Sequence, residues 1–238
     1  MYYSGLVQLV LVCGGVGARL PGRPPGLPKS MVQVGGEPLL ARLVRWLAPL
    51  HDDPAPVFIA SAADPFVPAY AAAHVPGARV VLQEQPDGVA NAALLAVSLL
   101  REGPVLVVLG DLFLEGTLKR PAPEAPALVV WPEGSAASTR ANFGVAVDGD
   151  GTVRDLIEKP GHGPGNTDGL VCGVGAYLLT RALIDSFARA PVNAARGERE
   201  ITEALRFTLR EGARYATWPL QGRYVNVNTA ADLAEASR

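Results

Sequence analysis

A short apolar run over residues 6–13 ends abruptly at three closely spaced glycines, Gly14, Gly15 and Gly17. An apolar run of this length followed by glycines predicts a strand buried on both faces that leads into a tight turn. The backbone N–H groups of such a turn can approach a phosphate closely, because glycine has no side chain. The segment therefore predicts an α/β fold with a phosphate-binding turn.

Basic residues follow the glycines, and no acidic residue lies among them to offset their positive charge. Arg19, Arg23 and Lys29 precede the first acidic residue, Glu37, and they can supply charge for the outer phosphates of a nucleoside triphosphate. The alternative is an ordinary turn followed by a solvated basic loop. Only three of the 21 Lys and Arg residues are lysines, so a lysine at position 29 indicates that a compact point charge is needed there. This favours binding of the triphosphate over the solvated loop. Leu20 breaks the strict dinucleotide-binding glycine pattern, and the chain has no P-loop sequence here.

Composition excludes several classes of protein. The 238 residues are 49% hydrophobic and 18% charged, which suits one α/β domain with a substantial core. A net charge of −2 argues against nucleic acid as a partner. Two cysteines make no disulfide framework, and three scattered histidines make a zinc site improbable. We find no leader or membrane span and expect a cytoplasmic protein without a membrane partner; the oligomeric state cannot be derived.

Strands and helices alternate along the first half of the chain. Apolar runs at 57–60, 79–82 and 105–109 read as buried strands, and residues 38–47 and 90–100 carry the apolar stripe of helices. This alternation predicts a single-domain, three-layer α/β sandwich with a mostly parallel central sheet. Ligands in such sheets bind beyond the carboxyl ends of the strands.

Asp111 follows the strand expected at 105–109, so it should share one cleft with Gly14. A turn aspartate or helix cap is the structural alternative.

The second half of the chain no longer alternates strands with helices. In residues 145–157 apolar and polar residues alternate around an Asp-Gly turn, which predicts a hairpin, and residues 171–179 are predicted to form another strand. We expect a nucleotide-binding half over about 1–120 and a sugar-phosphate-binding half over about 121–238, sharing one sheet.

Five motifs, in order, resemble those of the sugar-1-phosphate nucleotidylyltransferases, whose fold is Rossmann-like and GT-A-like. The first motif comprises Gly14, Gly15, Gly17, Arg19, Leu20, Pro28, Lys29 and Met31. The other four are a base-reading segment at 83–92, a metal aspartate within 109–113, a sugar-phosphate segment at 144–147 and 158–160, and a second metal position at 226–229.

The resemblance implies an enzyme that transfers a nucleotidyl group from a nucleoside triphosphate to a sugar 1-phosphate with Mg²⁺. Catalytic roles are implied for Arg19, Lys29 and Asp111, and metal binding for Asp111 and Asn226. Nucleotide binding is implied for Cys13, Gly14, Gly15, Gly17, Gln83 and Gly88. Sugar-phosphate binding is implied for Gly144, Glu158, Lys159 and Cys172. The Gln83 amide can read a pyrimidine edge, which tilts the choice of base towards uridine or thymidine.

Several positions depart from the family pattern. Ala18 stands where Thr or Ser is usual, Val89 replaces the commoner Thr or Leu, and Val171-Cys172 stands where many members carry Asn. Asn226 replaces the Asp of thymidylyl members, although Asn resembles the acetylglucosamine-1-phosphate uridylyltransferases. Two alternatives therefore stay open: the same chemistry on choline phosphate, molybdopterin or another phosphorylated acceptor, and a non-catalytic domain that binds nucleotide sugars.

Overall fold

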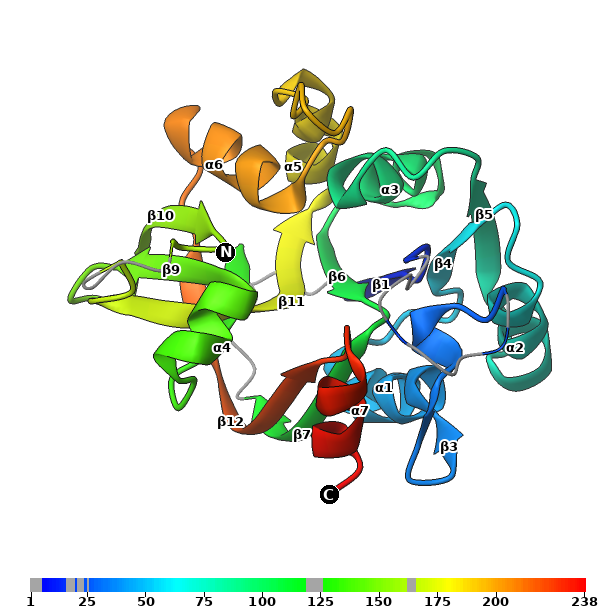
Figure 1. Cartoon of the computed structure of the whole chain (residues 1–238). Coiled ribbons are helices and arrows are strands. Elements are labelled where there is room, and N and C mark those ends of the chain that lie inside the picture. The colour runs from blue at the N-terminus through cyan, green and yellow to red at the C-terminus, as the bar shows by residue number, and fades with distance from the viewer. Residues whose placement is uncertain (1–5, 16–19, 21–23, 25, 119–125, 162–165) are drawn as a thin grey trace.

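The computed structural model describes residues 6–15, 20, 24, 26–118, 126–161 and 166–238. In this part of the chain a 10-stranded sheet crosses the molecule, and helices cover both of its faces (Figure 1). The strand order is β5-β4-β1-β6-β11-β8-β12-β7, with β9 paired to β11 and β10 paired to β9. Arg19 and Gly17 lie outside the described residues.

The first half of the sheet is parallel, as the sequence predicts. Its strands are β1 (Gln8–Val12), β4 (Val57–Ser61), β5 (Arg79–Gln83) and β6 (Pro104–Leu109). Each is a short apolar run, and crossovers that contain helices join them, so their carboxyl ends meet along one edge. The α/β class is confirmed.

The second half of the sheet is mixed, so parallel pairing is confined largely to the first half. Its strands are β7 (Leu112–Leu118), β8 (Ala127–Trp131), β9 (Phe143–Val147), β10 (Val153–Glu158), β11 (Leu170–Thr180) and β12 (Ala216–Asn226). Strands β11 and β6 pair antiparallel and join the two halves into one sheet. The predicted hairpin is β9 and β10. A small second sheet pairs β2 (Gln33–Val34) with β3 (Glu37–Pro38).

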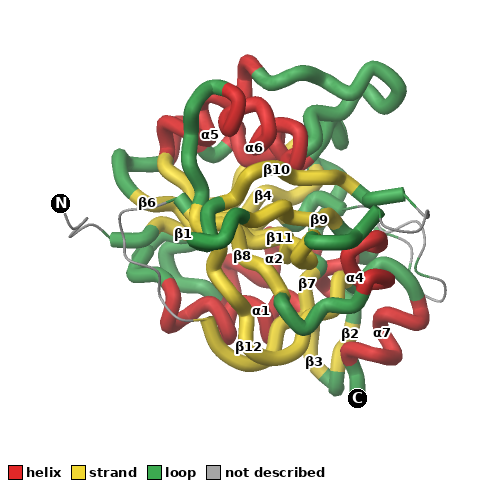
Figure 2. The backbone as a smooth tube through the Cα atoms, turned by 90° about the vertical axis from the view of Figure 1, so that its left-hand side faces the viewer, coloured by secondary structure: helices red, strands yellow, loops and turns green. Residues whose placement is uncertain are grey.

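Side chains alternate across β1 and divide the core into two layers. Val10 and Val12 pack towards one helical layer, whereas Leu9 and Leu11 pack towards the other. The first layer contains α3 (Val89–Leu95), α5 (Arg181–Ser186) and α6 (Ile201–Arg210), and the second contains α1 (Leu39–Leu47) and α2 (Phe66–His74). Figure 2 shows α5 and α6 above the strands.

Two shorter helices flank the second half of the sheet, α4 (Ala136–Ala141) and α7 (Ala230–Ala236). Short 3₁₀ turns are η1 (Lys29–Met31), η2 (Ala48–Leu50), η3 (Val97–Leu99) and η4 (Phe187–Arg189). The helix expected at 90–100 breaks after Leu95 and continues as η3. No helix in the described residues is long and apolar enough to cross a membrane.

Candidate functional site

A cleft of about 1020 Å³ opens beyond the carboxyl ends of β1 and β6. It contains residues from both halves of the chain, because β11 brings the second half of the sheet against the first. Its lining includes Gly14, Gly15, Lys29, Gln83, Gly88, Asp111, Glu158, Lys159 and Asn226. The structure therefore brings together nine of the residues named from the sequence.

Lys29 is the best-anchored cation of the cleft. Its ammonium lies 3.1 Å from Oδ2 of Asp111 and donates a hydrogen bond of 2.5 Å to Oδ1 of Asn228. The side chains of Lys29 and Asp111 are 13% and 20% exposed, so the pair is shielded but open to a ligand. Gly15 lies near the Lys29 side chain: a Cβ added there would come within 3.9 Å of Lys29 Cδ. The backbone of Gly15 and the charged side chain of Lys29 therefore lie next to each other in the cleft.

Strand pairing places Asp111 beside Asn226. Leu112 of β7 pairs with Asn226 of β12, and the N–H of Val227 donates to the Asp111 carbonyl at 2.9 Å. The Asn226 amide donates to Oδ1 of Asn142 at 2.9 Å, whereas its own Oδ1 is buried and has no hydrogen-bond partner among the described residues. Unpartnered buried oxygens are uncommon, because losing hydration without a new bond is costly.

The two oxygen donors fit a hard divalent cation. Such a cation takes one or two protein carboxylate or carbonyl oxygens and completes its shell with water and substrate phosphate. Asp111 offers a carboxylate, and Asn226 offers the unpartnered Oδ1. Within the described residues no cluster of three or more His, Cys, Asp or Glu side chains forms a dedicated metal site.

Gln83 is held with a defined orientation at the other end of the cleft. Its Nε2 donates to Oδ1 of Asp87 at 2.7 Å and, more weakly, to the Gly88 carbonyl at 3.4 Å. The acceptor Oε1 points towards Gly14, where an added Cβ would meet it at 3.1 Å. The free hydrogen-bonding atom of Gln83 is therefore an acceptor.

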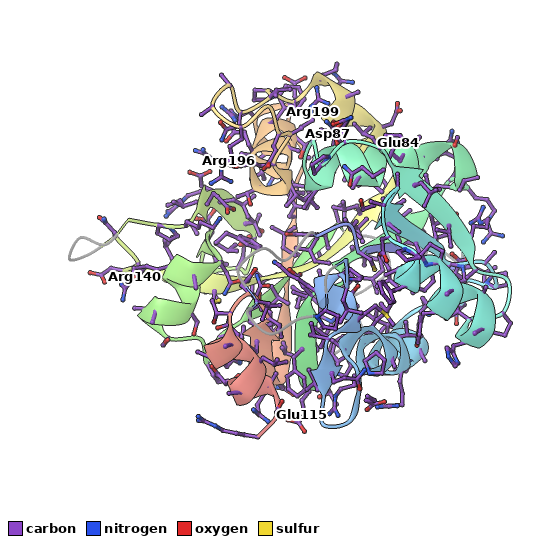
Figure 3. The ribbon with its side chains drawn as sticks, turned by 45° about the vertical axis from the view of Figure 1, so that its right-hand side comes forward. Glu84, Asp87, Glu115, Arg140, Arg196 and Arg199 are labelled. Carbon is purple, nitrogen blue, oxygen red and sulfur yellow. The ribbon has the colours of Figure 1, made fainter. Side chains whose placement is uncertain are left out.

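Gly88 lines the cleft, and the packing of the chain around it also requires a glycine. Its φ is +108°, and an added Cβ would lie 2.3 Å from the Arg199 carbonyl oxygen. The Arg199 N–H donates to the Asp87 carbonyl at 2.8 Å, so the chain near α6 packs directly on this turn. Figure 3 shows Asp87 and Arg199 side by side. Glycine is needed there for backbone packing.

Glu158 and Lys159 form the opposite wall, at the end of β10. Glu158 accepts a hydrogen bond of 2.7 Å from the Thr202 hydroxyl, and its Oε1 lies 3.5 Å from the Lys159 ammonium. The Lys159 N–H donates to the Asn142 carbonyl at 3.0 Å. Among the described residues Lys159 alone, other than glycines, has a positive φ, +42°. Such a conformation costs free energy and is characteristic of functional sites.

Three predicted ligand residues do not line this cleft. Gly144 faces Leu170, whose Cδ1 would lie 2.6 Å from an added Cβ, so glycine is needed for packing between β9 and β11. Cys172 is buried in the core, and burial raises the pKa of its thiol to about 11. Cys13 is also buried, and burial raises the pKa of its thiol far above the usual value. The roles expected for these three residues in binding the nucleotide and the sugar phosphate remain predictions, and Cys13 borders a smaller cavity of about 80 Å³ that Lys29 and Asp111 also line.

Some lining residues were not anticipated. Asn142, Tyr177, Thr202 and Asn228 border the cleft, and the sequence offers a signal only for Asn228, which follows Asn226 in the Asn-Val-Asn-Thr motif. Burial raises the pKa of the Tyr177 hydroxyl, and the charges of Glu158 and Asp111 raise it further. Tyr177 therefore remains a neutral hydroxyl that can donate a hydrogen bond.

Comparison with known proteins gives consistent results. A family model described as nucleotidyl transferase matches residues 8–238. A glucose-1-phosphate thymidylyltransferase of Streptomyces griseus is 27% identical, over 98% of this chain and 65% of that protein. A UTP–glucose-1-phosphate uridylyltransferase of Haloferax volcanii is 26% identical, over 98% of this chain and 96% of that protein.

Solved structures resemble this fold. A UDP-glucose pyrophosphorylase complexed with UDP-glucose superimposes with a TM-score of 0.78 at 17% identity, over 98% of this chain and 97% of that one. The chain spans 44% to 65% of the length of the first three curated relatives that it matches.

Proposed function

The chain belongs to the nucleotidyl transferase family, and we propose that it transfers a nucleoside monophosphate from a nucleoside triphosphate to a sugar 1-phosphate, releasing pyrophosphate. Relatives named as thymidylyl- and uridylyltransferases of glucose 1-phosphate support this reaction class. On this proposal the nucleotide binds mainly to residues 1–120 and the sugar phosphate mainly to residues 121–238.

The observation that carries the proposal is the pairing of two phosphate-binding walls across one cleft. Lys29, beside the glycines that follow β1, and Lys159, at the end of β10, both line the cleft; we assign the first to the nucleotide and the second to the acceptor. The chain has only three lysines, and two of them line this cleft. A cleft with cations on opposite walls suits a reaction that joins two phosphates.

The proposed chemistry needs no general base in the protein. A phosphate monoester is largely dianionic at neutral pH, since its second pKa is about 6. Its oxygen attacks the α-phosphorus of the triphosphate in line, and the bond to the pyrophosphate oxygen breaks. Catalysis then consists of positioning and charge neutralisation. Lys29 would stabilise the leaving pyrophosphate, Arg19 is proposed to assist it, and Lys159 and Glu158 would hold the acceptor.

Asp111 and Asn226 would hold a divalent cation, for which we propose Mg²⁺ because both donors are hard oxygens. When bound, the cation supplies positive charge that offsets the negative charge of the substrates. Asp111 provides the only formal negative charge of this donor pair, so its carboxylate should be indispensable.

The orientation of Gln83 supports a pyrimidine base with an N3–H donor. Because Nε2 is held by Asp87, only Oε1 is free to accept from a base. Uracil and thymine donate at N3, whereas cytosine accepts there. We therefore propose UTP or dTTP as the nucleotide substrate.

The test crosses ATP, CTP, GTP, dTTP and UTP with a set of acceptors, namely several sugar 1-phosphates, choline phosphate and molybdopterin, and measures pyrophosphate. We expect release with UTP or dTTP that depends on both the acceptor and Mg²⁺, and loss of turnover in Asp111→Asn with retention of the fold. Release only with choline phosphate or molybdopterin would change the acceptor. No release with any pair would favour a nucleotide-sugar-binding domain and overturn the proposal.

A further inference from the structure

Asn142 ends α4 and caps it with its side chain. Its Nδ2 donates at 2.9 Å to the carbonyl of Ser138, which belongs to the last turn of the helix. The same carbonyl also accepts from the backbone N–H of Asn142 at 3.2 Å, so the Asn142 side chain supplies its second donor. A carbonyl can only accept, so the Asn142 amide must present Nδ2 to the helix. Its Oδ1 consequently faces the other way.

The fixed Oδ1 of Asn142 determines the orientation of its neighbours. It accepts one hydrogen bond from the Tyr224 hydroxyl at 3.0 Å and another from Nδ2 of Asn226 at 2.9 Å. An amide that meets an acceptor must offer its NH₂ group. Asn226 therefore turns its NH₂ towards Asn142 and its Oδ1 away, where this oxygen is buried and finds no partner in the part of the chain that the structure describes.

We propose that Asn142 is a positioning residue that holds Oδ1 of Asn226 towards the divalent-cation site. This inference rests on the proposed function, because it assigns the free oxygen of Asn226 to that cation. Two hydrogen bonds in series set this orientation. The Ser138 carbonyl holds the Asn142 amide by its Nδ2, and Oδ1 of Asn142 in turn holds the Asn226 amide by its Nδ2. Without Asn142, the Asn226 amide could rotate and present NH₂ groups to a cation, which would repel it.

The same residue also reaches the acceptor wall. The backbone carbonyl of Asn142 accepts from the N–H of Lys159 at 3.0 Å. One residue thus connects the proposed cation ligand Asn226 with the proposed acceptor ligand Lys159. The positioning role also accounts for the amide at 226, because a carboxylate there would place an oxygen against Oδ1 of Asn142.

The test measures Mn²⁺ binding to the full chain by isothermal titration calorimetry, without nucleotide. Asn142→Ala removes the acceptor, and we expect about tenfold weaker binding or more, the range for removing an outer-shell partner of a metal ligand. Asn142→Asp keeps an acceptor oxygen for Asn226 but loses the donor to the Ser138 carbonyl, so it should bind Mn²⁺ more tightly than Asn142→Ala. Ser135→Ala is the matched control, because it removes the side-chain cap at the other end of α4, keeps the hydrogen bond between Asn142 and Asn226, and should leave Mn²⁺ affinity unchanged.

Equal Mn²⁺ affinity in the parent and Asn142→Ala would overturn the inference, as would an equal loss in Asn142→Ala and Asn142→Asp. Pyrophosphate release by the parent tests the proposed function separately: release with unchanged affinity in Asn142→Ala would overturn only the positioning role. A parent that releases no pyrophosphate yet shows the predicted affinities would overturn only the proposed function.

A measurement on the parent protein covers the case in which Asn142→Ala does not fold. In protein labelled with ¹³C,¹⁵N-asparagine, the side-chain NH₂ protons of Asn226, assigned by their loss in Asn226→Asp, should exchange slowly with solvent. Adding Mg²⁺ should shift the side-chain carbonyl carbon of Asn226 while this protection persists. Rapid exchange of these protons in the parent would overturn the inference.

Discussion

Lys29 and Asp111 form an ion pair in the cleft, with Nζ 3.1 Å from Oδ2, although they lie in separate segments of the chain. The contact means that an ammonium already neutralises the carboxylate proposed as a cation ligand. A divalent cation that binds to the free protein must therefore compete with Lys29 for Asp111. A triphosphate that engages Lys29 would release Asp111 for the cation, so binding of the two should be cooperative.

This competition predicts opposite effects from one substitution. Lys29→Met should bind Mn²⁺ more tightly than the parent in the absence of nucleotide, because the competing ammonium is gone. Its kcat should fall by about a hundredfold, as when one preorganised transition-state contact is removed. Calorimetry and pyrophosphate release measure the two quantities. Lys29→Arg, which keeps the charge, is the control; weaker Mn²⁺ binding in Lys29→Met would show that the lysine assists the cation.

Lys159 allows its ligand role to be separated from its backbone conformation. Lys159→Ala and Lys159→Gly both remove the amine and should raise KM for the sugar phosphate to a similar extent. They should differ in stability, because φ at 159 is +42°. The glycine variant should be more stable than the alanine variant by about 1 kcal/mol, the cost of the left-handed region for a residue with a Cβ. Urea unfolding and steady-state kinetics check both, and an unchanged KM would remove Lys159 from the acceptor site.

Asp87 is predicted to determine base choice through Gln83. Its Oδ1 accepts from Nε2 of Gln83 at 2.7 Å, whereas Asn at this position could offer a donor to Oε1 instead. Asp87→Asn should therefore allow the Gln83 amide to invert and lower the preference for UTP over CTP by about tenfold, roughly one hydrogen bond. The ratio of kcat/KM values measures this. Glu84→Gln, a nearby exposed carboxylate, is the control (Figure 3); equal ratios in both variants would contradict the assignment.

Cys172 should resist alkylation in the folded protein. Burial raises the pKa of its thiol from 9.0 to about 11, and hydrogen bonds from Thr139 and Asn142 oppose the rise only in part. A rise of this size reduces the reactive thiolate about a hundredfold at any pH well below 9, because the thiolate fraction falls tenfold per unit. Iodoacetamide labelling of a Cys13→Ser protein at pH 8, with and without urea, measures this. Equal rates in both conditions would contradict the burial of Cys172.

The sequence alone determined the features that depend on neighbouring residues. Apolar runs ending at glycine predicted the strand before Gly14, and the run before Asp111 predicted a cleft carboxylate; both are confirmed in position. Thr180 and Thr229 cap α5 and α7, because their side chains accept from the backbone N–H groups of Leu183 and Asp232 a few residues on. These features follow from local hydrogen-bonding and burial rules, so a few adjacent residues are enough to specify them.

Only the tertiary structure decided which side chains meet. Asn226 lies beside Asp111 because β12 pairs with β7 in one register, and Asn142 reaches Asn226 because α4 ends next to that pair. For the same reason, a motif alone cannot distinguish a glycine that a ligand approaches from one, such as Gly144 or Gly88, that another chain segment also approaches. Register and packing are set by contacts between residues far apart in sequence, and only the folded chain contains that information.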